Sequence, residues 1–333
     1  MAGTGSFTFT DPQMYQSAIR PAQVEVVVTT KGEFHAELKR IELSKLWVQS
    51  ARANLPVISH SAVSPQRAPI FFLANGNQAA YRYGGLDASL GEIIAVRPGS
   101  THYSRSEATA HWATLSLTRE DLAVAGRVFV GRELTAPSVS RRSRPSPKLM
   151  SRLLSLHEAA EKFAGAPVHV LQTEPVRALE HALTQAMIMC MTDGSPVEMR
   201  LGIRQHLAIL ARFEDFVMAN DNRPLYLAEI CAAVGASGRM LRMCCQEHLG
   251  MGPTRYLWLR RMHLARRALM EATPQTATVA RIAMEYGFWE LGRFAVKYRE
   301  QFGESPSASL HRPRHDRCER KNRPLALPFS ETA

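Results

Sequence analysis

Two short stretches in the last third of the sequence carry cationic side chains spaced for recognition of base edges. Arg239 and Arg242 are three residues apart, and Arg293 and Lys297 are four apart. Residues three or four apart share one face of a helix. An arginine on such a face can donate two hydrogen bonds to guanine O6 and N7, worth about 1 to 3 kcal/mol of discrimination, whereas a phosphate contact gives affinity without specificity. Either chemistry needs rigid helices that hold these side chains outward.

Both stretches lie in a repeated helix-turn-helix pattern. In each copy, apolar residues recur at helical spacing before and after a glycine, and glycine suits the left-handed backbone of a tight turn. Gly235 and Gly287, the two turn glycines, are 52 residues apart (287 − 235). The sequence therefore predicts a first unit over 227–249 and a second over 279–302.

The outward faces of the two second helices follow from helical geometry. In the first of these helices, over about 238–248, Leu241, Cys245 and Leu249 are expected to face inward, with Ser237 as the N-cap. Leu291 and Val296 of the second unit could contact thymine methyl groups, and Glu290 could accept from cytosine N4 or favour the helix N-terminus. The predicted DNA-facing residues are Ser237, Gly238, Arg239, Arg242, Met243, Glu290, Leu291, Gly292, Arg293, Val296 and Lys297.

A helix expected over 254–270 joins the two units. Its length is about 25 Å at about 1.5 Å per residue, which suits two recognition helices in adjacent major grooves about 34 Å apart. Four arginines on or beside this helix are candidates for phosphate contacts: Arg255, Arg260, Arg266 and Arg267.

The tandem pattern resembles the AraC/XylS transcriptional regulators over about 205–312. The matching residues are Ile282, Ala283, Gly287, Phe288, Phe294, Tyr298, Arg299, Phe302, Gly303 and Pro306, with Ser237, Leu241, Gly250, Pro253, Tyr256, Arg261 and Ala265. The resemblance implies a DNA-binding domain at 200–312, RNA polymerase as a partner, a homodimer and an activator. Family members often carry Arg at the positions of Met243 and Val296 and Phe at that of Cys245, so their base preference is not transferable.

The N-terminal half is expected to be a β-rich, effector-sensing domain over 1–125. Short runs of β-branched and aromatic residues between Gln23 and Leu117 predict a sheet closed into a barrel or sandwich. The segment 91–102 resembles the second half of a cupin motif, which implies a cupin-like barrel. Candidates for the pocket of an unknown small effector are Trp47, Phe72, Tyr81, Tyr83, His102 and Trp112, and core packing is the alternative for each aromatic residue.

The expected fold class is α+β, with this barrel, a helical extension and an all-α C-terminal domain. The middle region, 126–195, is expected to be helical. The family resemblance implies that these helices pair two subunits, and the alternative is that they simply cover the barrel through Leu153, Leu156, Leu179, Leu183, Ala186 and Met187. Arg141, Arg142 and Arg144 are expected in an exposed connector, Thr192–Met199 in an interdomain linker, and 313–333 in a basic flexible tail.

Composition and motif content argue against an enzyme. The 333 residues have a formal charge of +11, which favours polyanionic partners. We find no nucleotide-binding, nucleophile or metal-ligand motif, so no catalytic residue, metal or cofactor is expected. No apolar run is long enough to span a bilayer, and the N-terminus does not read as a secretory signal, so we expect a cytoplasmic protein. A non-specific architectural DNA binder, or a repressor with an effector-free N-terminal dimerisation domain, is the alternative to an effector-responsive activator.

Overall fold

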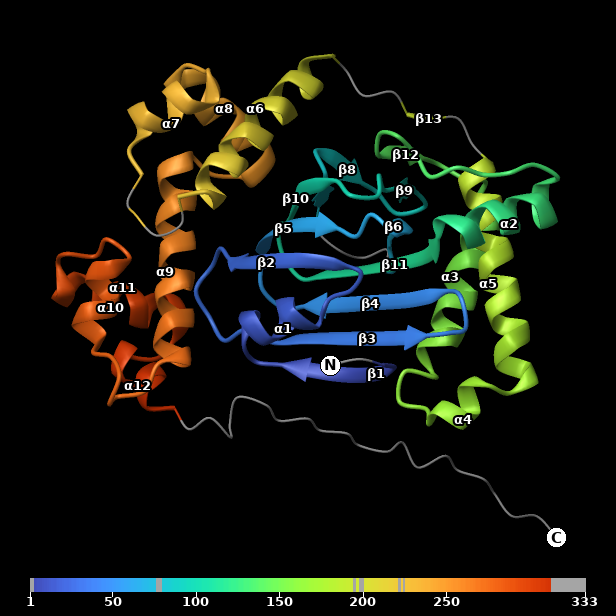
Figure 1. The fold of residues 1–333 in the computed structure, drawn as a ribbon, viewed down its shortest axis with the longest axis horizontal. Helices are drawn as coiled ribbons and strands as arrows, with labels where there is room; N and C mark the ends of the chain where they lie inside the picture. Colours follow the sequence, from blue (N-terminus) through green and yellow to red (C-terminus); the bar gives the residue numbers. More distant parts are fainter. Residues whose placement is uncertain are drawn as a thin grey trace, which may run out of the picture.

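The protein was analysed as a computed structural model that describes residues 3–75, 80–193, 196–197, 201–220, 223 and 225–312. A β-rich half lies in the centre, with the middle helices on one side and the C-terminal helices on the other (Figure 1). This arrangement confirms the α+β organisation. The tail expected at 313–333 and part of the linker expected at 192–199 lie outside the described residues.

The strands of the N-terminal half form two sheets. The larger has the order β1-β3-β4-β11-β6-β9-β12-β13, and the smaller has the order β2-β5-β10-β7-β8. The strands of the larger sheet are β1 (Gly5–Phe9), β3 (Ala36–Glu42), β4 (Trp47–Ala53), β6 (Arg67–Leu73), β9 (Ile93–Ala95), β11 (Ala110–Thr118), β12 (Arg141–Ser143) and β13 (Pro196–Val197). Those of the smaller sheet are β2 (Ala22–Val28), β5 (Val57–Val63), β7 (Tyr81–Tyr83), β8 (Leu86–Ala88) and β10 (Thr101–Ser106).

The two sheets are not closed into the expected barrel. In the part of the chain that the structure describes, no strand of one sheet pairs with a strand of the other. Successive strands instead cross between the sheets: β4 lies in the larger, β5 in the smaller and β6 in the larger again. Alternation along short strands is the same for a barrel and for two packed sheets, so the sequence does not distinguish them.

The larger sheet is buried on both faces. In β6, Ile70 and Phe72 pack against the middle helices, whereas Phe71 and Leu73 point between the sheets. The register brings Leu115 opposite both Ile70 and Val48, which continues the helix-facing layer across three strands. A continuous apolar run such as β6 is what two covered faces require.

The middle helices cover the outer face of the larger sheet. They are α2 (Arg119–Val130), α3 (Pro147–Glu161), α4 (Val168–Leu171) and α5 (Glu174–Thr192). Leu153, Leu183 and Met187 are fully buried against the sheet, while Leu156 and Leu179 are partly buried beside them. These residues therefore cover the sheet within one chain, which is one of the two interpretations that the sequence left open.

The expected connector around Arg141 is part of the sheet. Arg141–Ser143 form β12, which pairs with β9, and Arg144 Nη2 donates to Glu92 Oε1 at 2.7 Å. Glu92 is 4% exposed, so a buried carboxylate holds this basic segment in place. The Arg- and Ser-rich sequence does not indicate this contact, because Glu92 lies 52 residues earlier in the chain than Arg144.

The C-terminal half is entirely helical in its described residues. It contains α6 (Leu201–Met218), α7 (Leu227–Val234), α8 (Gly238–Leu249), α9 (Pro253–Glu271), α10 (Val279–Glu285), α11 (Leu291–Phe302) and α12 (Pro306–His311). Helix α9 runs between the pair α7–α8 and the pair α10–α11 (Figure 1). Gly235 and Gly287 take left-handed backbone angles, φ 66° and 76°, at the turns between the paired helices. No described helix is both long and apolar enough to cross a bilayer.

Candidate nucleic-acid interface

The recognition helix of the first unit is α8. The Ser237 hydroxyl accepts a hydrogen bond from the Met240 backbone N–H at 3.2 Å, which caps the helix. Leu241 and Cys245 point into the core of the unit. Arg239 and Arg242 are exposed, as are Ser237 and Met243, and Gly238 is half-buried. The predicted groove-facing residues of this helix therefore lie on a free surface.

The recognition helix of the second unit is α11. Phe294 and Tyr298 anchor its inner face, and Val296 is 57% exposed on the outer face. Two outward cations are held by neighbouring acids: Arg293 lies 3.6 Å from Glu290, and Lys297 lies 3.0 Å from Glu300. Such exposed pairs contribute about 1 kcal/mol or less, so DNA phosphates can replace the acidic partners at little cost. Glu290, Leu291 and Gly292 are exposed at the N-terminal end of this helix.

One tryptophan that was not among the predicted DNA-facing residues lies beside this surface. Trp289 precedes α11 and is 70% exposed. It lines a cleft of about 770 Å³ between α9 and the second unit, together with Arg255 and Arg261. Arg255 stacks over Trp258, with its guanidinium carbon 4.6 Å from the ring centroid. The position of Trp289 in the turn just before α11 is the sequence feature from which this tryptophan could have been predicted.

The four candidate phosphate contacts separate into two classes. Arg255 and Arg267 are exposed. Arg260 and Arg266 are only 4% and 8% exposed, and both pair with acids of the β-rich half. The expectation for Arg260 and Arg266 is therefore corrected, because a buried and paired guanidinium cannot reach a phosphate in this arrangement of the two halves.

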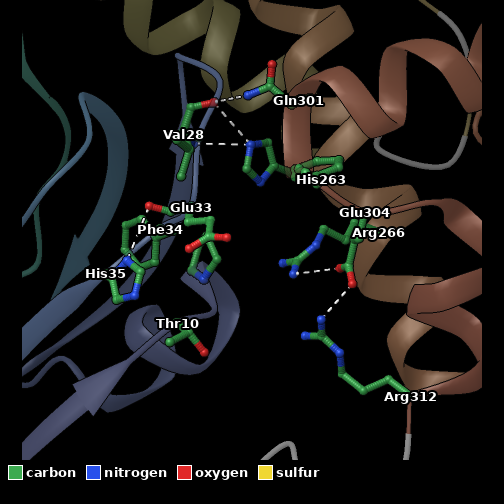
Figure 2. A pocket seen from close by; sticks show the side chains of 14 residues that line it. Thr10, Val28, Glu33, Phe34, His35, His263, Arg266, Gln301, Glu304 and Arg312 are labelled. Carbon is green, nitrogen blue, oxygen red and sulfur yellow. Dashed lines mark hydrogen bonds and ion pairs between the residues drawn. The ribbon is translucent and has the colours of Figure 1, made fainter.

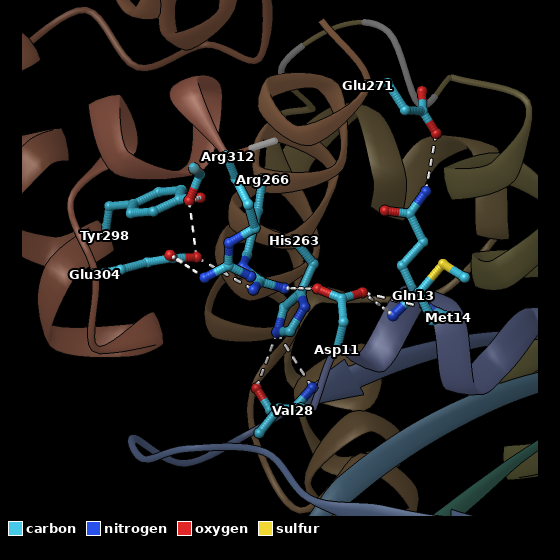
Figure 3. A network of polar contacts seen from close by, with 11 residues as sticks. Asp11, Gln13, Met14, Val28, His263, Arg266, Glu271, Tyr298, Glu304 and Arg312 are labelled. Atoms are coloured by element: carbon cyan, nitrogen blue, oxygen red, sulfur yellow. Dashed lines mark hydrogen bonds and ion pairs between the residues drawn. The ribbon is translucent and has the colours of Figure 1, made fainter. Parts of the chain in front are cut away.

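Arg266 lies at the centre of a polar network between the halves (Figure 3). It donates to the Asp11 carboxylate on one side and to Glu304 on the other, at 3.2 Å, and Arg312 donates to Glu304 at 2.6 Å. Burial opposes the charge on Arg266, but the carboxylates of Asp11 and Glu304 raise its pKa above the ordinary value. The second unit is therefore fixed to the β-rich half through charged hydrogen bonds. Below, these four residues are called the acid–arginine network.

A hollow of about 230 Å³ lies next to this network (Figure 2). On one of its walls, the His263 Nε2 atom is 3.2 Å from both the backbone N and the backbone O of Val28. Gln301 donates to the backbone oxygens of Val28 and Thr30, at 3.2 and 3.0 Å. Burial lowers the pKa of His263 to about 4, so its ring is neutral at pH 7. All of these contacts are polar.

The first unit meets the β-rich half differently. Ile58 and Tyr103 of the smaller sheet belong to the same apolar cluster as Phe213 and Tyr256 of the C-terminal half. The Tyr103 and Tyr256 rings are 5.8 Å apart at 89°, and their hydroxyl oxygens are 3.3 Å apart. The core of the first unit is thus completed by residues of the other half.

The expected effector-pocket residues are divided among four places. Tyr81, Tyr83 and Trp112 line a hollow of about 60 Å³ between the two sheets, where Phe71, which the sequence did not single out, stacks on Tyr83 at 4.1 Å. Burial raises the pKa of Tyr81 to about 12.

The other three expected residues lie elsewhere. Phe72 packs edge-on against His157 beneath the middle helices, and Arg67 lies over the Trp47 ring at 4.0 Å. His102 lines a different cleft, between the smaller sheet and α6, although its ring lies 4.3 Å from that of Tyr83. Half of the predicted set therefore meets around the interior hollow.

The adjacent cysteines of α8 are both buried. Cys244 and Cys245 are 0% exposed, and burial raises the pKa of the Cys245 thiol to about 12. Protonated, inaccessible thiols are poor nucleophiles. They fill the core, as small apolar residues do.

Comparisons with known proteins agree with this geometry. Residues 230–312 match a family described as a helix-turn-helix domain. The chain is 33% identical over 150 residues to a probable thc operon regulatory protein of Rhodococcus erythropolis, covering 43% of this chain and 45% of that protein. It is 35% identical over 99 residues to the XylDLEGF operon transcriptional activator 2 of Pseudomonas putida, covering 30% of this chain and 63% of that protein. Among solved structures, the AraC-like transcriptional activator CuxR is similar with a TM-score of 0.41 at 16% identity, covering 79% of this chain and 95% of that one.

The chain thus spans about half of the length of these two regulators. The family match begins in α7 and ends after α12, so it contains both recognition helices. With its tandem helix-turn-helix units on either side of α9, the C-terminal half of this chain carries a helix-turn-helix domain of the AraC type.

Proposed function

We propose that this protein is a sequence-specific transcription factor that binds double-stranded DNA and activates an operon in response to a small effector. The observation that carries the proposal is the pair of exposed recognition faces at the two ends of α9. The relatives' names support it, since one is an operon activator and another an operon regulatory protein.

The spacing of the two units suits one face of a DNA duplex. Helix α9 has 19 residues, which at about 1.5 Å each gives about 28 Å. Successive major grooves are about 34 Å apart, and the width of the flanking units supplies the remainder. One subunit would therefore place α8 and α11 in two adjacent grooves, and a homodimer would read a second such pair.

The residues on the two faces suit base edges. Arg239 and Arg242 can each bind guanine O6 and N7, and Val296 and Leu291 can contact thymine methyl groups. Met243 and Val296 are 45% and 57% exposed, and apolar side chains make no favourable contact with phosphates. An architectural protein that binds only the phosphate backbone would not need them.

The effector and the remaining partners belong to the same proposal. The interior hollow between the sheets, about 60 Å³ and lined by Tyr81, Tyr83 and Trp112, is the proposed site of a small effector. RNA polymerase is the expected partner of an activator. A repressor with an effector-free N-terminal half would leave this hollow empty.

Two matched arginine variants test the DNA proposal. Arg242→Ala should relax specificity at one base pair by about 1 to 3 kcal/mol, because it removes a bidentate base contact. Arg255→Ala should weaken binding to all sequences alike and reduce the salt slope by about 1, because it removes a phosphate contact.

The measurement is competition binding on a footprinted operator and a panel of single-base variants, at several salt concentrations. Equal losses for both variants across the panel would contradict the assignment of Arg242 to base recognition. The absence of any discrete footprint would favour the architectural alternative.

A further inference from the structure

Three metal-binding side chains converge where α6 crosses the end of α8. His206 comes from α6, and Glu247 and His248 come from the last turn of α8. One potential ligand atom from each residue lies within 4.8 Å of the other two. His206 Nδ1 is 2.6 Å from the Glu247 carboxylate, so the first two are already in contact.

His248 is buried without the hydrogen bonds that normally accompany a buried histidine. Its side chain is 3% exposed, and neither ring nitrogen has a hydrogen-bond partner among the described residues. Leaving such a group unsatisfied costs about 1 to 3 kcal/mol. Among the described residues, both ring nitrogens are therefore open to a ligand that the protein does not supply. A neutral imidazole with a free lone pair is a metal ligand in its binding form.

We propose that His206, Glu247 and His248 bind a divalent transition-metal ion of the zinc type. Two imidazole nitrogens and one carboxylate oxygen form a ligand set that zinc uses when its fourth position is left to water. Magnesium and calcium prefer all-oxygen sets, which this cluster does not offer.

The geometry requires only a small rearrangement of these side chains. Zinc–nitrogen bonds of about 2.0 Å and zinc–oxygen bonds of about 2.1 Å place tetrahedral ligand atoms about 3.3 Å apart. His206 and Glu247 are partly exposed, with 20% and 33% of their side-chain surfaces open, so both can rotate toward the buried His248. A cleft of about 340 Å³ that His248 also lines gives access from solvent and room for the water ligand.

The charge around the cluster is balanced. Arg82 donates to the backbone oxygen of Glu247 and is the cation that opposes a metal there. Its own charge is neutralised by Asp87, 2.8 Å away. The Glu247 carboxylate therefore remains available to the ion.

A bound ion would fasten α6 to the C-terminal end of α8. Helix α8 belongs to the first helix-turn-helix unit, and α6 packs on that unit and shares its apolar cluster. Occupancy should therefore raise the unfolding temperature of the protein whether or not DNA is bound.

The test uses the full chain, freed of metal by a chelator and carrying no histidine tag. Titration with Co²⁺ followed by visible absorption, then displacement by Zn²⁺, should show one site per chain with nitrogen and oxygen ligands. His206→Gln and Glu247→Gln should each weaken Zn²⁺ binding at least about tenfold, as loss of a ligand does. His311→Gln, an exposed histidine at the end of α12, should leave it unchanged.

Three results would overturn the site. They are no stoichiometric binding, unchanged affinity in both ligand variants, or the thiolate-to-cobalt band that reports cysteine ligands. Circular dichroism of each variant would establish that it is folded. Because the readout is metal binding, failure here leaves the DNA proposal untouched.

Discussion

The two helix-turn-helix units have the same internal plan but are joined to the β-rich half by different forces. The first unit completes its apolar core with Ile58 and Tyr103 of the smaller sheet, and two polar contacts, Arg82 with Glu247 and His60 with Glu214, lie beside that core. The second unit keeps its own core and meets that half through the acid–arginine network and through Gln301. An apolar join resists salt and pH, whereas a charged one depends on geometry and protonation. We infer that the second unit is the one more easily released.

The largest expected effect comes from breaking the acid–arginine network. Arg266→Met leaves Asp11, 6% exposed, without its cationic partner, and breaking a buried pair in this way costs about 3 to 5 kcal/mol. Adding Asp11→Asn, which keeps an N-cap residue for α1 (Pro12–Ala18), should recover much of the loss. Urea unfolding of both single variants and the double variant gives the coupling energy. A double variant that costs the sum of the two single variants would show that the pair is not coupled.

The apolar join should be sensitive to truncation instead. Ile58→Ala removes a side chain that is 1% exposed, and such a change typically costs about 2 to 4 kcal/mol. Because the interaction is apolar, the loss should be the same at low and high salt. Val128→Ala, at a 66% exposed position of α2, is the matched control and should cost almost nothing. A strongly salt-dependent loss for Ile58→Ala would remove the distinction between the two joins.

The smallest expected effect is a change in pH dependence. Burial lowers the pKa of His263 to about 4, below the ordinary value of about 6.5, so the folded protein holds this ring neutral while the unfolded chain protonates it. Above about pH 6.5 the ring is neutral in both states, so this shift does not change the free energy of unfolding. As the pH falls from 6.5 toward 4, only the unfolded chain takes up the proton, so the free energy of unfolding falls.

His263→Gln should therefore flatten the fall in unfolding free energy over that range, by less than about 1.4 kcal/mol per pH unit, the limit for one proton. Thermal or urea unfolding at pH 4.5 to 7 measures it, with exposed His311→Gln as the control. If the wild type and His263→Gln had parallel pH profiles, His263 would not be the group responsible.

Local sequence patterns were sufficient for the elements of the C-terminal half. The turn at Gly235, the cap at Ser237 and the inward positions of Leu241 and Cys245 depend on residues within a few positions of one another. Hydrophobic periodicity and turn-forming residues in the sequence predict such local relations directly.

Long-range pairings could not be read in the same way. Asp11 and Arg266 are 255 residues apart, and a charged residue on an amphipathic helix looks the same whether it faces DNA or a partner domain. In β6, every residue is buried, so alternation cannot tell that Phe71 faces the interior hollow and Phe72 the helices. The convergence of His206 with Glu247 and His248 likewise depends on how α6 crosses α8.

The shared core around Tyr103 also bears on the solubility of fragments. If the chain were cut between its two halves, Tyr256, now 2% exposed, would lose the Tyr103 ring that packs against it. The isolated C-terminal fragment would then expose an apolar patch beside its proposed DNA-binding surface. We expect such a fragment to aggregate unless polar residues are placed there.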